Sequence, residues 1–234
     1  MEINIITVNC CRFLILRLNI MKKYKCIIFD CDGVLVDTEV TSNQLLVDMA
    51  NKYGANIDLD FAMKHFKGSH FSDCLAIIKT LVKEDVPQSF ENEYRTELDK
   101  QFKATVEPIK GVKEVIENLK IPYCVASSGT VDKIRLNLDL VGLLPYFEGK
   151  IFSCYTIKKW KPEPDVFLLA AKTMGFKPEE CLVIEDSKLG VLGAKNGGFD
   201  VLGYTEHDYY NDLESLATKT FNNMNDLLEM LKES

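Results

Sequence analysis

The sequence has few histidines and no paired cysteine motif. It contains three histidines in 234 residues, and none of its eight cysteines forms a C-x-x-C pair. The cysteines are scattered, mostly among apolar neighbours, at positions 10, 11, 26, 31, 74, 124, 154 and 181. This scatter disfavours both a zinc site and a disulfide framework. We therefore expect reduced, buried thiols and a cytoplasmic protein.

A surplus of positive charge is also missing. The chain has 28 lysines and arginines against 35 aspartates and glutamates, which gives a formal net charge of -7. Without a global basic field, neither nucleic acid nor an anionic membrane surface is an expected partner. We expect a monomer that binds a small molecule, and an anionic molecule would need local cations or a metal ion.

No stretch of the chain is apolar and uncharged for long enough to predict a membrane span. The first 20 residues are apolar, but Arg12 and Arg17 interrupt them, and Glu2 stands where a signal peptide would carry positive charge. We interpret residues 1–20 as a leader outside the fold or a misassigned start, with Met21 opening a more ordinary sequence. The alternative is a short strand or helix packed on the domain.

The chain does contain an alternation of short apolar runs and helical stretches. Runs typical of strands buried on both faces occur at 25–30, 123–127, 150–153, 181–185 and 200–204. Helices are predicted at 111–119, 130–140, 164–174, 187–196 and 223–232. The alternation predicts an α/β fold, a doubly wound parallel sheet with helices on both sides.

One long segment breaks this alternation. Residues 38–106 are rich in leucine, methionine, lysine and glutamate at helical spacing and contain no clear strand. We predict a helical domain at 38–106, inserted into a core domain formed by residues 21–37 and 107–234. Hinges are expected near 37–39 and 106–110.

Two aspartates follow the first predicted strand. Asp30 and Asp32 leave an apolar run and are followed by Gly33. In open α/β sheets, ligands bind at the carboxyl ends of the strands, so both carboxylates would lie at the mouth of a site. Taken alone, the same pattern is also typical of a plain turn or part of a calcium loop.

Other strand ends carry residues suited to anions and cations. Ser127 and Ser128 precede a helix whose N–H groups could hold an anion, although they could equally cap that helix. Lys161 lies beside Pro162, where a fixed ammonium suits phosphate, and a solvated surface lysine is the alternative. Two acids, at positions 185 and 186, end a buried strand and favour an oxygen-ligated cation such as Mg²⁺.

The order of these residues resembles the four motifs of the haloacid dehalogenase (HAD) superfamily. The matching positions are Asp30, Asp32, Ser127, Lys161, Glu185 and Asp186. The resemblance extends over residues 22–234 and implies a Rossmann-like core with an inserted helical cap. More narrowly, the chain is similar to the β-phosphoglucomutase-like branch, and residues 66–68 and 155–162 are similar to bacterial 6-phosphogluconate phosphatases.

These parts suffice for hydrolysis of a phosphomonoester. Asp30 would attack phosphorus to give an aspartyl phosphate. Asp32 would protonate the leaving alcohol and later deprotonate the attacking water. Ser127, Ser128 and Lys161 would hold the phosphoryl oxygens as charge spreads over them.

A magnesium ion completes the predicted site. Mg²⁺ would bridge Asp30 and a phosphate oxygen, with Asp186 as a further ligand. The resemblance adds the main-chain carbonyl of Asp32 and the Glu185 carboxylate, which would bind directly or through water. Closure of the helical cap would exclude bulk water.

Three other functions fit parts of the pattern. A phosphosugar mutase shares the core motifs, but β-phosphoglucomutases carry a histidine in the first cap helix where this chain has Ser42, and residues 129–131 lack their polar and basic groups. A dehalogenase needs no Mg²⁺ and has little use for Asp32. A phosphorylated signalling receiver, which is not an enzyme, would be about half this length and lack the insertion.

Selectivity would come from the helical insertion, where Lys67, Ser69 and His70 flank Gly68. Their ordinary interpretations are a solvated lysine and residues at a helix start. If Lys67 pairs with a carboxylate on the leaving group, the substrate is a phosphosugar acid such as 6-phosphogluconate rather than a neutral phosphosugar.

Overall fold

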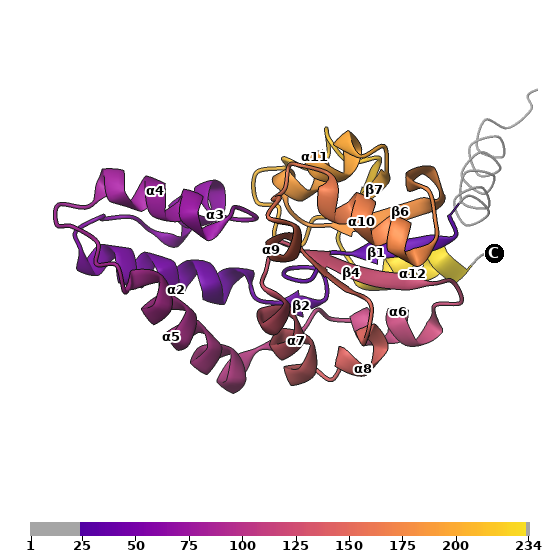
Figure 1. Cartoon of the computed structure of the whole chain (residues 1–234), viewed down its shortest axis with the longest axis horizontal. Coiled ribbons are helices and arrows are strands. Elements are labelled where there is room, and N and C mark those ends of the chain that lie inside the picture. The colour runs from indigo at the N-terminus through magenta and orange to yellow at the C-terminus, as the bar shows by residue number, and fades with distance from the viewer. Residues whose placement is uncertain (1–23, 233–234) are drawn as a thin grey trace, which may run out of the picture.

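A six-stranded parallel sheet forms the centre of the molecule, as a computed structural model of residues 24–232 shows (Figure 1). The prediction for residues 1–20 lies outside the described residues. In spatial order the strands are β5 (Ile151–Ser153), β4 (Tyr123–Ser127), β1 (Cys26–Phe29), β6 (Cys181–Glu185), β7 (Asp200–Tyr204) and β8 (Lys219–Phe221). All neighbouring pairs are parallel, so their carboxyl ends share one edge of the sheet.

Helices cover both faces of this sheet. One face packs against α6 (Val112–Asn118), α7 (Val131–Leu140), α8 (Leu144–Phe147) and α12 (Met224–Lys232). The other packs against α9 (Cys154–Ile157), α10 (Asp165–Met174) and α11 (Lys188–Asn196). A short 3-10 turn, η1 (Pro178–Glu180), leads into β6. The predicted α/β fold, doubly wound and parallel, is confirmed.

The sixth strand, β8, is the main omission from the sequence prediction. It has three residues, and only Phe221 is buried, so it gives no continuous apolar run. The five predicted strands occur within a residue or two of their expected ends, because each is an uninterrupted apolar segment buried from both sides.

Four further helices lie together beyond one end of the sheet (Figure 1). They are α2 (Glu39–Lys52), α3 (Leu59–His65), α4 (Phe71–Leu81) and α5 (Phe90–Thr105). They enclose a hydrophobic cluster of their own, which includes Ile78, Phe90 and Phe102. These helices occupy the segment predicted as an insertion, and the domain boundaries themselves stay a prediction.

The helical segment is joined to the rest of the chain through a short antiparallel pair, β2 (Val36–Asp37) and β3 (Glu107–Pro108). Each strand has two residues, too few for a sequence signal, yet they lie at the two predicted hinges. In the described range, no helix has the length and apolar character needed to cross a bilayer. The cytoplasmic location stays a prediction.

Candidate active site

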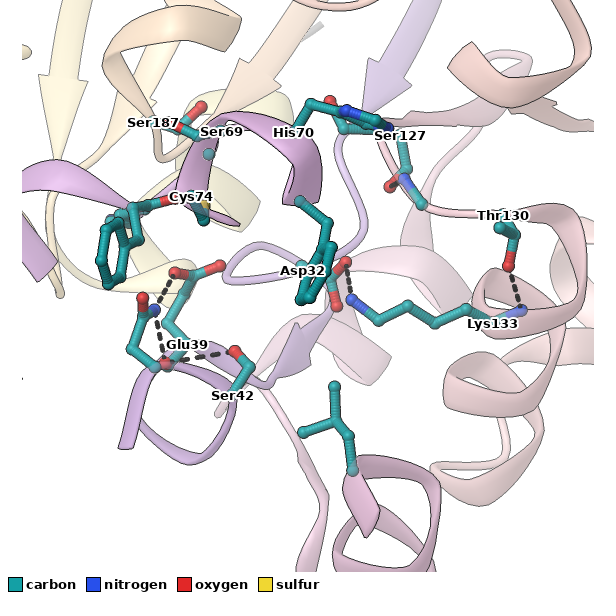
Figure 2. Close-up of a pocket in the computed structure, with 18 of the residues that line it drawn as sticks. Asp32, Glu39, Ser42, Ser69, His70, Cys74, Ser127, Thr130, Lys133 and Ser187 are labelled. Atoms are coloured by element: carbon teal, nitrogen blue, oxygen red, sulfur yellow. Dashed lines mark hydrogen bonds and ion pairs between the residues drawn. The ribbon is translucent and has the colours of Figure 1, made fainter. Parts of the chain in front are cut away.

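The carboxyl ends of β1, β4 and β6 open into a cavity of about 440 Å³ between the sheet and the helices α2–α5 (Figure 2). All ten residues that the sequence proposed for the site line this cavity. They are Asp30, Asp32, Lys67, Ser69, His70, Ser127, Ser128, Lys161, Glu185 and Asp186. A cavity of this size with convergent polar groups is typical of a small-molecule site.

Lys161 joins two of the buried acids. Its Nζ lies 2.5 Å from Asp30 Oδ1 and 2.5 Å from Glu185 Oε1. Burial alone would lower the pKa of Lys161, but the carboxylates of Asp30 and Glu185 raise it above its usual value, so the ammonium keeps its charge. Asp30 Oδ2 accepts no hydrogen bond from residues 24–232, so one carboxylate oxygen remains available to a ligand.

Glu185 is held on both sides. Its Oε1 faces Lys161, while Oε2 accepts hydrogen bonds from the backbone N–H of Ser187 at 2.8 Å and from the Ser187 hydroxyl at 3.0 Å. Gly190, in the first turn of α11, makes room for this carboxylate, because a Cβ there would overlap it. The structure thus places Glu185 as the group that orients Lys161, and a direct metal contact stays a prediction.

Asp32 has a different set of neighbours, of which Figure 2 shows Lys133. Its Oδ2 lies 2.9 Å from Lys133 Nζ, and its Oδ1 accepts hydrogen bonds from Thr38 Oγ1 at 2.7 Å and Asn137 Nδ2 at 3.1 Å. Burial opposes the charged form of Asp32, but the Lys133 ammonium and the Thr38 hydroxyl outweigh it and lower its pKa. These surroundings favour the carboxylate form.

Lys133 and Asn137 are two of the site residues that sequence reasoning missed. They are four residues apart on α7, so both project from one face of the helix toward Asp32. The available signal was their spacing in a helix predicted to start at the end of a strand, where the first turns face the site.

Asp186 lies against Lys67, which comes from the loop between α3 and α4. Lys67 Nζ is 2.8 Å from Asp186 Oδ2, and it donates to the backbone carbonyls of Asp186 at 2.8 Å and His207 at 3.2 Å. Burial would lower the pKa of Lys67, but the Asp186 and Glu39 carboxylates raise it. In this arrangement the Lys67 ammonium points toward the part of the protein that contains the sheet.

The surroundings of Asp186 fit a cation. Asp186 Oδ2 is buried and, among the described residues, meets only the Lys67 ammonium. Gly33, at φ +76°, leaves space next to it, since a Cβ there would overlap that oxygen. Within residues 24–232, no group of three or more His, Cys, Asp or Glu side chains is already arranged as a metal site. The donors present are nevertheless all oxygen, which suits Mg²⁺.

Ser127 and Ser128 both line the cavity, and neither caps α7. Thr130 is the N-cap residue, and its hydroxyl accepts a hydrogen bond from the backbone N–H of Lys133. Ser127 is buried at the end of β4, and its Oγ accepts from the backbone N–H of Gly129 at 3.1 Å. Because neither serine hydroxyl is used to cap the helix, both are available to bind a ligand.

The family assignment follows from comparison with known proteins. A family model described as haloacid dehalogenase-like hydrolase matches residues 27–204. The match spans well over half of the chain, so the protein belongs to the haloacid dehalogenase-like hydrolases. The predicted family is confirmed, and with it the prediction of a hydrolytic enzyme.

Individual proteins are similar to this chain over most of its length. The chain is 30% identical over 217 residues to the 6-phosphogluconate phosphatase of Escherichia coli, covering 91% of this chain and 96% of that protein. It is similar to a solved haloacid dehalogenase-like protein of unknown function from Agrobacterium tumefaciens, with a TM-score of 0.80, 30% identity, and coverage of 89% and 97%. A proposed β-phosphoglucomutase from Thermotoga maritima has a TM-score of 0.70, 27% identity, and coverage of 89% and 99%.

Proposed function

We propose that this protein is a Mg²⁺-dependent phosphatase of small phosphomonoesters that works through an aspartyl phosphate. The observation that carries the proposal is the contrast between Asp30 and Asp32 within one cavity. Among the described residues, Asp30 keeps one carboxylate oxygen free of hydrogen-bond donors, whereas three side chains hold Asp32. Two carboxylates in different surroundings suit two different roles.

Asp30 is the nucleophile in this proposal. Its free oxygen attacks phosphorus, the bond from phosphorus to the leaving oxygen breaks, and an aspartyl phosphate forms. Lys161 holds the Asp30 carboxylate in place at 2.5 Å. Water then attacks the same phosphorus, which releases inorganic phosphate and restores the carboxylate.

Asp32 moves the protons for both steps. It gives a proton to the leaving alcohol and takes one from the attacking water, a role worth typically ~10²–10⁴-fold in rate. Its contacts with Thr38, Lys133 and Asn137 fix its direction and favour the carboxylate, which is the form needed for the second step.

The phosphoryl oxygens would be held by groups from two separate segments. Ser127 and Ser128 present hydroxyls at the end of β4, and Lys161 supplies a positive charge. Donors already fixed in position stabilise charge on a transferring phosphoryl group without reorganisation.

Asp30 and Asp186, with the main-chain carbonyl of Asp32, would hold the magnesium ion. When bound, Mg²⁺ neutralises phosphate charge and orients the phosphoryl group for in-line attack. The support for this assignment is the all-oxygen donor set and the space that Gly33 leaves beside Asp186. Magnesium binding through Asp186 Oδ2 would require that Lys67 release this oxygen, which it now contacts.

The proposed substrates are phosphorylated sugars or sugar acids, with 6-phosphogluconate as the leading example. The named activity of the Escherichia coli relative supports this class. A mutase is disfavoured because position 42 carries a serine, whose hydroxyl donates to the backbone carbonyl of Thr38 at 2.6 Å and is too weakly basic to act as a histidine would.

The test is phosphate release from a panel of phosphosugars, phosphosugar acids and p-nitrophenyl phosphate, with Mg²⁺ and with excess chelator. We expect Mg²⁺-dependent release that is abolished in Asp30→Asn, because an amide is a very poor nucleophile. Full activity in chelator, or near-native turnover in Asp30→Asn, would rule the proposal out. Conversion of one sugar phosphate into its isomer, without phosphate release, would identify a mutase.

A further inference from the structure

The wall of the cavity formed by α5 and α9 carries a cluster that the proposed chemistry does not use. Arg95 Nη2 donates to the Tyr155 hydroxyl at 2.9 Å, and that hydroxyl lies 2.9 Å from His70 Nε2. All three residues line the cavity. Arg95 and His70 come from the helices α2–α5 and their connections, whereas Tyr155 comes from the sheet side, so the cluster joins the two parts.

Arg95 is oriented by neighbours and still has donors to spare. Its Nε and Nη2 donate to Glu91 Oε1 at 2.9 and 2.7 Å, and its Cζ lies 5.7 Å from the ring centres of Phe71 and Tyr155. A guanidinium has five N–H groups in a planar fork. Both N–H groups of Nη1 are without an acceptor among residues 24–232.

The other cations of the cavity are already paired with acids that line it. Lys67 faces Asp186, Lys133 faces Asp32, and Lys161 faces Asp30 and Glu185. Glu91, the partner of Arg95, is not part of the cavity wall. Among the described residues, Arg95 is therefore the one lysine or arginine of the cavity wall that forms no ion pair with an acid of that wall.

We propose that Arg95, positioned by Glu91 and Tyr155, binds a carboxylate on the leaving group, at the end of the substrate away from the phosphate. This inference rests on the proposed phosphatase function and gives it a substrate class, a phosphorylated sugar acid. A planar guanidinium suits a carboxylate because it can donate two parallel hydrogen bonds. Arg95 thus takes the role that the sequence suggested for Lys67.

The test compares two substrates that differ only at the far end. 6-Phosphogluconate carries a carboxylate where sorbitol 6-phosphate carries a hydroxymethyl group. The wild-type enzyme should prefer the acid in kcat/KM, and Arg95→Gln should lower that preference by roughly 10–150-fold, as expected for one charge-assisted contact. Arg95→Lys should recover part of the preference, because it keeps the charge but loses the fork.

Arg135→Gln is the matched control, since Arg135 lies on α7 and pairs with the exposed Glu148 outside the cavity. It should leave the preference for the acid unchanged. An equal loss in Arg95→Gln on both substrates and on p-nitrophenyl phosphate would overturn the inference, because it would show a role in folding or closure. So would an undiminished preference for the acid. Failure of the wild-type enzyme to hydrolyse any of the three would instead contradict the proposed function.

Discussion

Asp30 and Asp32 are identical side chains whose neighbours make them chemically different. Asp30 shares the Lys161 ammonium with Glu185, whereas Asp32 has a lysine of its own and two further hydrogen-bond donors. Because the Lys161 ammonium is buried and the Lys133 ammonium is partly buried, the effect of each on its carboxylate is stronger than it would be in water. The proposed division of labour between nucleophile and acid/base rests on these partners rather than on the aspartates alone.

Removal of the Lys133 charge should change how activity depends on pH. Lys133 lowers the pKa of Asp32, so Lys133→Met should raise that pKa and move the acidic limb of the kcat profile to higher pH. At neutral pH the loss in kcat should stay below the ~10²–10⁴-fold expected when an acid/base is removed. The measurement is kcat with p-nitrophenyl phosphate between about pH 4 and pH 8.

Lys133→Arg keeps the charge and serves as the control, and its profile should remain close to that of the wild type. A Lys133→Met profile that falls in height without moving along the pH axis would show that Lys133 does not act through Asp32.

Part of this site could be predicted from the sequence, and part could not. Asp30, Asp32, Ser127 and Asp186 follow apolar strands, and the parallel topology brings strand ends together. By contrast, Asp32 contacts Lys133, which lies 101 positions further along the chain, and Asn137, which lies 105 positions further along. Such pairs depend on the angle at which α7 packs, which no local pattern encodes.

At the scale of elements, the end of β6 and the start of α11 act as one unit. Ser187 is the N-cap residue of α11, its hydroxyl accepts from the backbone N–H of Gly190, and the same residue donates to Glu185. Helix capping and the position of Lys161 are therefore linked through one carboxylate. A change at the helix start should affect the active site as well as stability.

Gly190→Ala tests this link. The new Cβ would overlap the Glu185 carboxylate, and overpacking of this kind should lower Tm by roughly 2–10 °C and reduce kcat, because Glu185 and Lys161 must move. Gly193→Ala is the control in the same helix, since its Cβ would meet its nearest neighbours at 3.4 Å. The Tm and kcat of both variants should be measured together. Equal behaviour of the two variants would contradict the account.

Some strands are determined by their own apolar sequence, and others by partners that are distant in the chain. The strands β4, β6 and β7 match their predicted ranges because each apolar run is buried on both faces. By contrast, β8 and the β2–β3 pair exist through hydrogen bonds to partners distant in sequence. Their own residues carry too little pattern to predict a strand.

At the scale of the whole molecule, the cavity lies between two parts that each have a hydrophobic cluster of their own. One is the sheet with its flanking helices, and the other is formed by the helices α2–α5. The sheet supplies the fixed carboxylates, and the helices α2–α5 supply Arg95, His70 and the adjoining Lys67. Lys67 and Asp186 lie 119 positions apart in the chain, yet their contact helps to hold the two parts together. In the proposed function, this arrangement separates phosphoryl chemistry on the sheet side from recognition of the leaving group on the helical side.

The central claim is that a phosphoryl group passes through Asp30, and trapping of that intermediate tests it most directly. Asp32→Asn should still be phosphorylated by p-nitrophenyl phosphate, whose leaving group departs without a proton, but it should hydrolyse the intermediate slowly. Acid quenching followed by peptide mass spectrometry should then find the phosphoryl group on Asp30. Its presence on another residue, or rapid wild-type turnover with no phosphorylated Asp30 in either enzyme, would contradict the account.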